Sequence, residues 1–366
     1  MNIFVLTSSR ADYSIYLPLL KKLKSDDYFQ LKIIAFGTHL SLNHRYTVDE
    51  IIKDGFEIVH KIDTLPKGDS PKMIAGSMAL AISKFASIWE SEKENIDLIF
   101  CLGDRYEMFA AVTASVPFNI PVAHLHGGET TLGAIDNSFR NSITSMSNFH
   151  FVSTEKNAKR VEQITNSKNH VYIVGAMALD NLYEIKLLSK EEFKDKFSIT
   201  LKEPALVTFH PETIAYQKNE HYINELLIAL YEVEKQIVIT MPNADTGNEL
   251  MRERILDFVK IKNNAYVVES LGTQGYFSCI EHSAFLLGNS SSGIIEAASF
   301  GKYVIDLGFR QKGRETGKNV IHCDFKKDEI LDVIKKIKTL PPLKRENIYG
   351  DGKSSEKIIS ILKTIG

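Results

Sequence analysis

Cysteine is scarce in this chain, and the few cysteines are widely separated. Cys101, Cys279 and Cys323 are odd in number, and they supply neither a disulfide framework nor a closely spaced metal-binding pair. Isolated thiols of this kind are typical of a reducing compartment. We therefore expect a cytoplasmic protein.

The chain also lacks an excess of charge and a long apolar run. Its 44 Lys and Arg nearly balance 46 Asp and Glu, for a formal net charge of −2, so no basic surplus is present to bind a nucleic-acid backbone. The most apolar stretch, 73–89, is interrupted by three serines and a lysine and predicts an amphipathic helix, not a membrane span. The start of the chain, 1–7, has no basic lead and predicts a first strand, not a signal peptide. Neither nucleic acid nor membrane is an expected partner.

Two common nucleotide-binding motifs are missing as well. After the first predicted strand the chain reads Thr-Ser-Ser-Arg-Ala-Asp-Tyr-Ser over 7–14, which is neither GxGxxG nor a P-loop. This disfavours a dinucleotide oxidoreductase and an ATPase. Hydroxyls and Arg10 at the start of a helix suit a phosphate, while an ordinary helix cap explains the same residues equally well.

The regular feature of the chain is an alternation of short apolar strands with helical patterns. A chain of 366 residues exceeds one compact core, so we expect two domains. Strands that are apolar on both faces are typical of buried parallel sheets. The predicted strands are 3–6, 31–36, 57–60, 98–102 and 122–125 in a first series, and 171–174, 205–209, 236–240, 265–268, 284–287 and 302–306 in a second.

This βαβ rhythm predicts an α/β protein of two Rossmann-like, doubly wound domains that face a cleft. We place an N-terminal domain at 1–170 and a second domain at 171–350. We expect a last helix within 351–366, which can pack back on the first domain.

Ligands of open parallel sheets bind beyond the carboxyl ends of the strands, and polar residues recur there. Asp104 and Arg105 follow one strand and suit a sugar or a phosphate, or form a local ion pair at a helix start. His124, His126 and Glu129 follow the next strand around two glycines. Acid–base work is the favoured interpretation, and a zinc site and a plain glycine turn are the alternatives.

Further candidates stand at other strand ends and helix starts. Asp136 opens a predicted helix, and Arg140 lies one turn later on the same face. His210, stiffened by the following proline, is a candidate proton donor. Asn243 and Asp245 also follow a predicted strand.

The most informative segment is the serine-rich run 288–296. Ser290, Ser291 and Ser292 lead directly into an apolar helix, where amides, hydroxyls and the helix dipole favour an anion. Glu296, one turn inside, suits the two hydroxyls of a ribose. Arg310 follows the next strand and balances phosphate charge; Arg314 is placed similarly. A serine-capped helix is the alternative.

Together these segments resemble the UDP-N-acetylglucosamine 2-epimerase family. The similarity is greater to its hydrolysing branch, which occurs in bacterial sialic-acid synthesis and in the epimerase half of the bifunctional animal enzyme. The resembling runs occur in order over nearly the whole chain: 9–13, 103–105, 124–129, 136 with 140, 210–213, 243–247, 288–293 and 310–314.

The resemblance implies a fold of the glycosyltransferase-B type and a UDP-sugar ligand. It places Ser290 and Ser291 on the diphosphate, Glu296 on the ribose and Arg310 beside the phosphates, with Arg10 closing over the diphosphate. The remaining residues expected to bind substrate are Ser14, Arg105, His126, Arg140, Asn243, Asp245 and Ser292. Where this chain has His126, many relatives carry Glu.

The implied reaction converts UDP-N-acetylglucosamine into N-acetylmannosamine and UDP. UDP is eliminated and the resulting glycal is hydrated, with no cofactor or metal required. The catalytic candidates are Asp104, Glu129, Asp136 and His210. The alternatives are the same chemistry on a UDP-2,4-diacetamido-2,4,6-trideoxyhexose of the legionaminic acid pathway, a non-hydrolysing epimerase and a glycosyltransferase. A homodimer is the expected assembly.

Overall fold

The computed structural model describes residues 1–41, 46–65, 70–132, 135–212, 216–242 and 248–365. The chain forms two compact units. The first unit comprises Met1–Glu129, Asp136–Glu184 and Tyr349–Gly366, and the second comprises Thr130–Ile135 and Ile185–Ile348.

The first unit is built on a seven-stranded parallel sheet in the order β3-β2-β1-β4-β5-β6-β7. The chain places β2 and β3 on one side of β1 and then returns to place β4 and the later strands on the other side, which is the doubly wound pattern. The strands are β1 (Asn2–Thr7), β2 (Gln30–Phe36), β3 (Ile58–Ile62), β4 (Leu98–Leu102), β5 (Val122–Leu125), β6 (Phe149–Val152) and β7 (Val171–Ile173).

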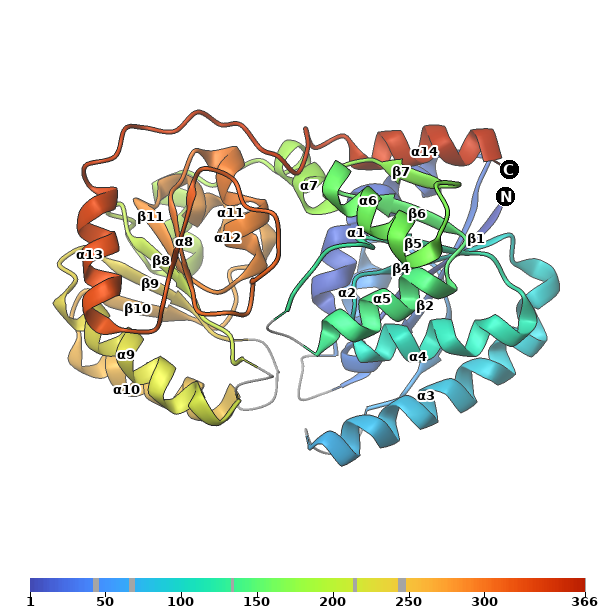
Figure 1. Ribbon diagram of the computed structural model, residues 1–366, viewed down its shortest axis with the longest axis horizontal. Coiled ribbons are helices and arrows are strands. Elements are labelled where there is room, and N and C mark those ends of the chain that lie inside the picture. Colours follow the sequence, from blue (N-terminus) through green and yellow to red (C-terminus); the bar gives the residue numbers. More distant parts are fainter. Residues whose placement is uncertain (42–45, 66–69, 133–134, 213–215, 243–247, 366) are drawn as a thin grey trace. The chain divides into compact units, whose positions relative to one another are not determined.

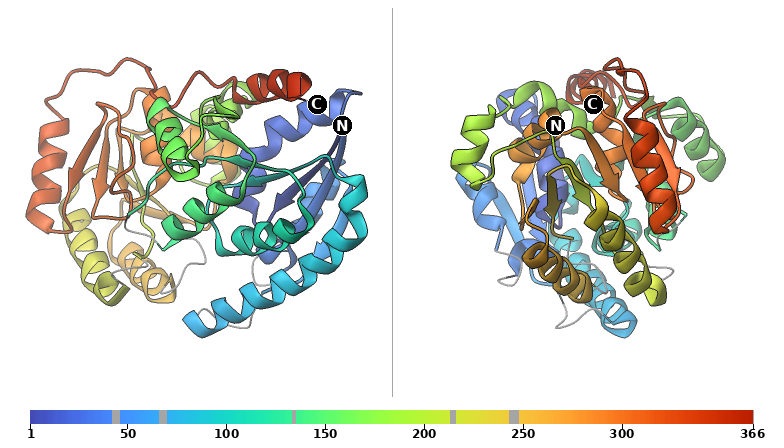
Figure 2. Two further views of the ribbon diagram at one scale, coloured as in Figure 1. Left: turned by 45° about the vertical axis from the view of Figure 1, so that its right-hand side comes forward. Right: turned by 90° about the vertical axis from the view of Figure 1, so that its left-hand side faces the viewer.

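Helices cover both faces of this sheet (Figures 1 and 2). Alternate strand residues serve the two faces: Ile3 and Val5 pack with one core, while Phe4 and Leu6 pack with the other. The first core is completed by α1 (Arg10–Ser25), α2 (Val48–Lys53) and α14 (Ser354–Ile365). The second is completed by α3 (Pro71–Glu92), α4 (Tyr106–Ser115) and α5 (Asp136–Met146). Shorter helices of this unit are α6 (Glu155–Thr165) and α7 (Asp180–Glu184).

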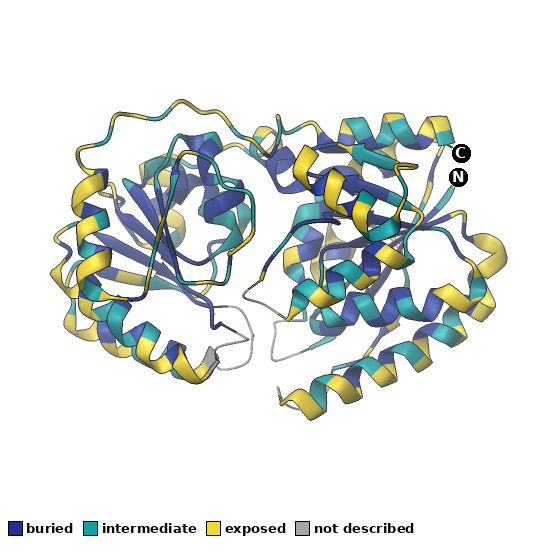
Figure 3. Ribbon diagram, viewed as in Figure 1, coloured by how far each residue is buried: buried dark blue, intermediate teal, exposed yellow. Residues whose placement is uncertain are grey.

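The second unit repeats the pattern with six parallel strands in the order β10-β9-β8-β11-β12-β13. Its strands are β8 (Ala205–Thr208), β9 (Ile237–Thr240), β10 (Ala265–Val268), β11 (Phe285–Gly288), β12 (Val304–Leu307) and β13 (Val320–Cys323). One face packs against α9 (Asn219–Glu232), α10 (Asn248–Ile261) and α13 (Lys327–Ile337). The other elements are α8 (Lys190–Phe197), α11 (Gly272–His282) and α12 (Ser291–Ile295). Buried residues are concentrated in the strands of both sheets (Figure 3).

The last helix returns to the first unit, where α14 lies beside α1 (Figure 2). Its first backbone amides are capped by a residue far away in sequence. The buried carboxylate of Asp180 accepts from Ser354 N at 2.9 Å and from Ser355 N at 2.6 Å. A helix start needs such acceptors, so Asp180 holds α14 in place.

Three details differ from the sequence expectation. The segment at 171–174 does not open the second domain: β7 pairs with β6 as the last strand of the first sheet, through His150↔Val171. The chain therefore leaves the first unit at Glu184, later than the predicted boundary at 170. Both β6 and β13 are strands that the sequence analysis did not predict.

The described residues contain no helix that is both long enough and apolar enough to cross a lipid bilayer. The longest helix, α3, has 22 residues and buries a single face of Ser77, Ala81, Phe85 and Trp89. It is amphipathic, as the interrupting serines and lysine predicted.

Candidate functional site

In the first unit the polar residues gather where the strand order reverses. The turn after β1 and the turn after β4 leave neighbouring strands at the same edge of the sheet. Such a switch point opens a crevice for ligands in doubly wound sheets. The runs 8–10 and 103–105 lie there.

The turn after β1 is held by one buried carboxylate. Ser9 caps α1 and forms a capping box with Asp12. The Asp12 carboxylate accepts from Ser8 N at 2.9 Å, from Ser8 Oγ at 2.8 Å and from Ser9 N at 3.1 Å. It also accepts from Thr7 Oγ1 at 2.5 Å. This network explains why the run needs Ser, Ser and Asp.

His39, which sequence reasoning missed, completes this network. Its ring is fully buried and bridges Thr7 Oγ1 at 2.9 Å and Thr47 Oγ1 at 2.8 Å. Burial alone would raise the pKa of the Asp12 carboxyl, but the hydrogen bond and charge of His39, with the Thr7 and Ser8 donors, hold that pKa below its usual value. The Asp12 carboxylate is therefore an ionised acceptor at neutral pH for the donors of this turn.

Arg10 and Ser14 stand on the first turns of α1. Arg10 is the first helical residue and is half-buried. The Ser14 hydroxyl donates to the Arg10 carbonyl at 2.8 Å, so its proton is used inside the helix. The structure thus presents Arg10 on a rigid helix start.

The turn after β4 carries two carboxylate–guanidinium pairs. Asp104 forms an ion pair with Arg140 of α5, whose side chain is buried. Arg105 forms a two-point pair with Glu107, at 3.2 and 3.0 Å. The sequence placed Arg140 near Asp136, but tertiary folding brings it to Asp104. Asp136 is the first residue of α5 and is half-buried.

His124 has a structural environment. Its Nε2 donates to the Gly103 carbonyl at 2.8 Å, and its Nδ1 lies 3.1 Å from Thr144 Oγ1. Burial lowers the pKa of His124 to about 3, so the ring is neutral and ties the ends of β4 and β5 together. A Cβ on Gly127 would lie 3.0 Å from this ring.

Gly128 is required by packing too. Its φ is +73°, and a Cβ there would lie 2.3 Å from the Asn157 carbonyl of α6. Protein atoms therefore occupy the space beside both glycines.

His126, Glu129 and Ser153 form a buried cluster at the ends of β5 and β6. His126 Nδ1 lies 2.7 Å from Glu129 Oε1, and Ser153 Oγ donates to the same oxygen at 2.6 Å. His126 has φ +63° and lies beyond the end of β5, so strand alternation does not set the direction of its side chain. Ser153 was missed because its strand, β6, was missed.

The second unit has an equivalent switch point between β8 and β11. There the Asn289 side chain binds the backbone of His210 twice, accepting from its N–H at 2.7 Å and donating to its carbonyl at 2.8 Å. Gln311 and Arg310 donate to the Asn289 carbonyl at 2.9 and 3.2 Å. His210, itself buried, is thus linked to the turn that bears Arg310.

Glu212 is a second structural residue that the sequence did not single out. Its buried carboxylate accepts from Phe309 N at 2.8 Å. This bond joins the segment after β8 to the turn after β12, next to Gly308, where a Cβ would lie 2.6 Å from the same carboxylate.

The serine-rich run forms a short capped helix. The Ser290 side chain accepts from Ser292 N at 3.4 Å as the N-cap of α12. Ser291 and Ser292 are its first residues, and half-buried Glu296 is its C-cap. Gly288, with φ +140°, passes so close to β8 that a Cβ would lie 2.0 Å from the Thr208 carbonyl.

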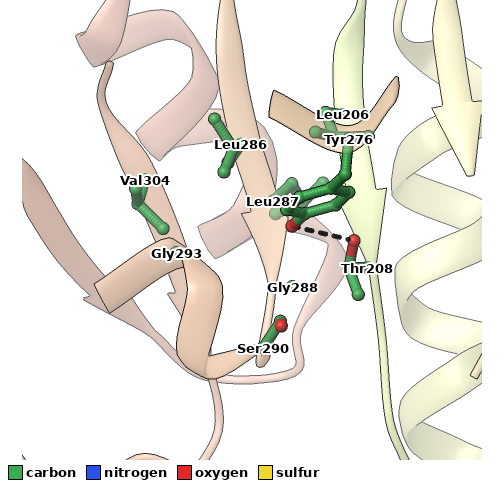
Figure 4. Close-up of a pocket in the computed structure, with 9 residues that line it drawn as sticks. All are labelled: Leu206, Thr208, Tyr276, Leu286, Leu287, Gly288, Ser290, Gly293 and Val304. Carbon is green, nitrogen blue, oxygen red and sulfur yellow. Dashed lines mark hydrogen bonds between the residues drawn. The ribbon is translucent and has the colours of Figure 1, made fainter. Parts of the chain in front are cut away.

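Behind this run lies a cavity of about 10 Å³ (Figure 4). The hydroxyl of Tyr276 points toward Thr208 at 3.5 Å, and Ser290 lies at one edge. Burial raises the pKa of Tyr276 to about 12. A space of this size holds one water at most, so it is part of the packing and does not accommodate a sugar nucleotide.

A larger groove of about 420 Å³ lies at the ends of β12 and β13, lined in part by Phe309, Lys312 and His322. Asp306 accepts from His322 Nδ1 at 2.7 Å. Burial raises the pKa of Asp306, and the hydrogen bond to Asp306 raises the pKa of His322. This groove is mixed in charge, and Arg314 is the charged residue proposed for the phosphates that lines it.

Two predicted residues, Asn243 and Asp245, lie outside the described residues, as does Thr213. Within the part of the chain that the structure describes, no group of three or more His, Cys, Asp or Glu side chains is placed to hold a metal ion. The two histidines of the zinc alternative have protein partners instead: a carbonyl and a hydroxyl for His124, and a carboxylate for His126.

Two doubly wound units with polar residues at both switch points define a two-domain α/β protein of the glycosyltransferase-B type, the fold of enzymes that bind sugar nucleotides. Comparison with known proteins agrees with this class. The family model described as UDP-N-acetylglucosamine 2-epimerase matches residues 21–363. The chain belongs to the UDP-N-acetylglucosamine 2-epimerase family.

Relatives at moderate identity span nearly the whole chain. The UDP-N,N'-diacetylbacillosamine 2-epimerase (hydrolyzing) of Legionella pneumophila is 34% identical, over 100% of this chain and 96% of its own length. The polysialic acid biosynthesis protein P7 of Escherichia coli is also 34% identical, over 90% and 84%. The crystal structure of UDP-GlcNAc 2-epimerase from Neisseria meningitidis bound to UDP-GlcNAc matches with a TM-score of 0.84 and 18% identity, over 100% of both chains.

Proposed function

We propose that this protein is a hydrolysing UDP-N-acetylglucosamine 2-epimerase that releases N-acetylmannosamine and UDP. The observation that carries the proposal is the division of the candidate residues between the units. Asp104, Glu129 and Asp136 lie in the first unit, while the serine-rich turn, Glu296 and Arg310 lie in the second. Whole-chain relatives with hydrolysing 2-epimerase activity in their names support the same chemistry.

In this proposal the second unit binds the nucleotide. Ser290, Ser291 and Ser292 surround the diphosphate, Arg310 balances its charge, and Glu296 accepts from the ribose hydroxyls. Arg10 of the first unit completes the diphosphate site, and Ser14, Asn243 and Asp245 belong to the substrate-binding set.

The nucleotide half is tested by Glu296→Ala. A lost hydrogen bond to a charged group costs about 1.5–3 kcal/mol, so the variant binds UDP more weakly by roughly tenfold to a hundredfold. Isothermal calorimetry measures this, and Glu315→Ala, another half-buried glutamate of the second unit, is the control. Equal UDP affinity of wild type and E296A would refute the ribose assignment.

The sugar half performs elimination and hydration. A carboxylate takes the proton from C2. The electron pair of the C2–H bond forms the C1=C2 double bond, and the C1–O bond breaks with UDP as leaving group. C2 is not acidic, so C1–O cleavage runs ahead and is assisted by cations around the diphosphate. Water then adds at C1, and a proton is delivered to the other face of C2. Arg105, Arg140, His126 and His210 bind or protonate the sugar in this scheme.

Isotope labelling tests the proposed reaction. In deuterated water the released N-acetylmannosamine carries deuterium at C2, and in ¹⁸O-water the released UDP contains no heavy oxygen. Heavy oxygen in UDP would mean attack at phosphorus and overturn the mechanism. Return of UDP-N-acetylmannosamine in place of free sugar would identify a non-hydrolysing epimerase.

A second substrate is favoured by one observation. The Legionella relative, which matches this chain from end to end, is named for UDP-N,N'-diacetylbacillosamine. That sugar keeps the 2-acetamido group and the proton at C2, so the same residues serve the same chemistry. Comparing kcat/KM for the two UDP-sugars decides between them, and the sugar with the higher value is the substrate.

We also propose that the enzyme is a cytoplasmic homodimer, the commonest assembly of such enzymes. Light scattering after size-exclusion chromatography tests the assembly, and a monomer mass at working concentration contradicts it.

A further inference from the structure

The buried cluster at the ends of β5 and β6 constrains which carboxylate can serve as a base. Asp104 is paired directly with the guanidinium of Arg140. This contact commits the Asp104 carboxylate to a buried guanidinium, whose charge needs a partner. Glu129 has different neighbours, because the described bonds to its Oε1 come from an imidazole and a hydroxyl.

Both ring nitrogens of His126 have protein partners in this arrangement. The backbone N–H of Met177 donates to its Nε2 at 3.4 Å, so this nitrogen carries no proton. The proton therefore lies on Nδ1 and points at Glu129 Oε1, 2.7 Å away. This tautomer follows from the hydrogen-bond partners, and it occupies both ring nitrogens with protein groups.

Ser153 supplies the second donor to the same oxygen, at 2.6 Å, and is buried together with Glu129. A carboxylate oxygen that receives two neutral donors is stabilised as an anion and fixed in direction. The φ of +63° at His126 places a non-glycine residue in a rarely populated region, which persists where surrounding contacts determine it.

We propose that Ser153 and His126 are positioning residues that hold Glu129 ionised and oriented as the base that takes the proton from C2. The inference rests on the proposed function. His126 then acts through Glu129, in place of the direct contact with the sugar that the proposed function gave it. When Glu129 accepts the C2 proton, the C–H electron pair forms the C1=C2 bond and UDP departs with the C1–O electrons.

Titratable and charged groups near the cluster in the described structure include His126 on the same loop, His124 on β5, His150 on β6 and the pair of Arg140 with Asp104. Burial lowers the pKa of His124 to about 3 and that of His150 to about 4, so neither is charged near neutrality. A shift of the acidic limb that appears in a Ser153 variant and not in its control therefore reports on Glu129, the carboxylate that Ser153 contacts.

The test is the pH profile of kcat/KM for Ser153→Ala. Without its hydroxyl the anion of Glu129 loses one donor, and the acidic limb moves to higher pH by about 0.5–1 unit, the equivalent of one hydrogen bond. Ser147→Ala is the matched control, because its hydroxyl donates to the Ile143 carbonyl at 2.8 Å elsewhere in the first unit. S147A leaves the limb unchanged.

A double-mutant comparison separates positioning from structure. Glu129→Gln lowers turnover by about 10²-fold or more, the scale of a lost base, and S153A has no further effect in that background. UDP affinity is the same in all variants. Should S153A not fold, His126→Gly replaces it, since Gly tolerates positive φ and removes the imidazole donor to Glu129, and the same shift is expected.

The outcomes are distinct from those of the proposed function. If the wild type releases no UDP from either UDP-sugar, the proposed function falls and this inference with it. The inference alone is overturned by either of two results with an active wild type. In one, the acidic limb of the kcat/KM profile lies at the same pH in S153A and wild type. In the other, S153A lowers turnover by the same factor in the E129Q background as in the wild type.

Discussion

Asp12→Asn should destabilise the first unit strongly while leaving its surface unchanged. The carboxylate receives donors on both oxygens: Thr7 Oγ1 and Ser9 N on Oδ1, Ser8 N and Ser8 Oγ on Oδ2. In either orientation an asparagine turns its NH₂ toward one of these pairs. One buried backbone N–H then loses its acceptor.

The expected loss follows from these contacts. A hydrogen bond to a charged group contributes about 1.5–3 kcal/mol, and an unsatisfied buried donor costs about 1–3 kcal/mol. The serine or threonine hydroxyl can rotate to accept from the new NH₂, so its bond is partly kept. We expect the free energy of unfolding at pH 7 to fall by about 2–4 kcal/mol, a large share of a typical total of about 5–15.

The same residue predicts the sign of a pH effect. The pKa of Asp12 is lowered from 3.8, so the folded state favours the ionised form more than the unfolded state does. This stabilisation is present above the unfolded pKa and is lost as pH falls through the folded one. The difference in free energy of unfolding between wild type and D12N should therefore become smaller as pH falls below 3.8.

Urea denaturation followed by circular dichroism at several pH values measures both effects. Asp49→Asn, an exposed residue in the first turn of α2, is the control and should stay within about 0.5 kcal/mol of wild type. The reasoning would be refuted if D12N were as stable as D49N. It would also be refuted if the difference in free energy of unfolding between wild type and D12N stayed constant as pH fell.

Two further predictions concern the backbone. Asp180→Asn should weaken the cap that its carboxylate provides for Ser354 and Ser355; hydrogen exchange in α14 should speed up, at a cost of about 0.5–2 kcal/mol, and unchanged exchange would contradict the capping role. Gly288→Ala should destabilise by more than about 2 kcal/mol, because its Cβ would lie 2.0 Å from the Thr208 carbonyl at a φ of +140°. Gly76→Ala in α3, where nothing lies within 4 Å, should instead stabilise by up to about 1 kcal/mol, and thermal unfolding that ranked the two variants the other way would count against the close approach.

Local patterns were enough to predict most of the fold. The strands β4 and β5 have the bounds that the sequence predicted, because a buried parallel strand is apolar on both faces and needs no partner to be recognised. The strand β13 was missed because its residues lie at a sheet edge and are only partly buried. The boundary was misplaced because membership of β7 in either sheet depends on pairing, which leaves no local pattern.

The candidate site, like the fold, was predicted only in part from the sequence. The sequence alone located the turns that bear Arg10, Asp104, Glu129, Ser290 and Arg310, because residues that follow strands lie at the ligand edge of any parallel sheet. Their roles within those turns were less accessible. Asp12 and Glu212 stood in the quoted runs, yet both carboxylates serve the backbone of neighbouring turns.

Only the tertiary structure decided which side chains meet. His126 contacts Ser153 and Met177, and Arg140 contacts Asp104, across 27, 51 and 36 residues of chain. The order of strands in the sheet sets these pairs, since it determines which turns lie side by side. Periodicity and turn residues record the environment of each segment by itself, whereas the partner of a buried polar group depends on a hydrogen bond that forms after the sheet has assembled.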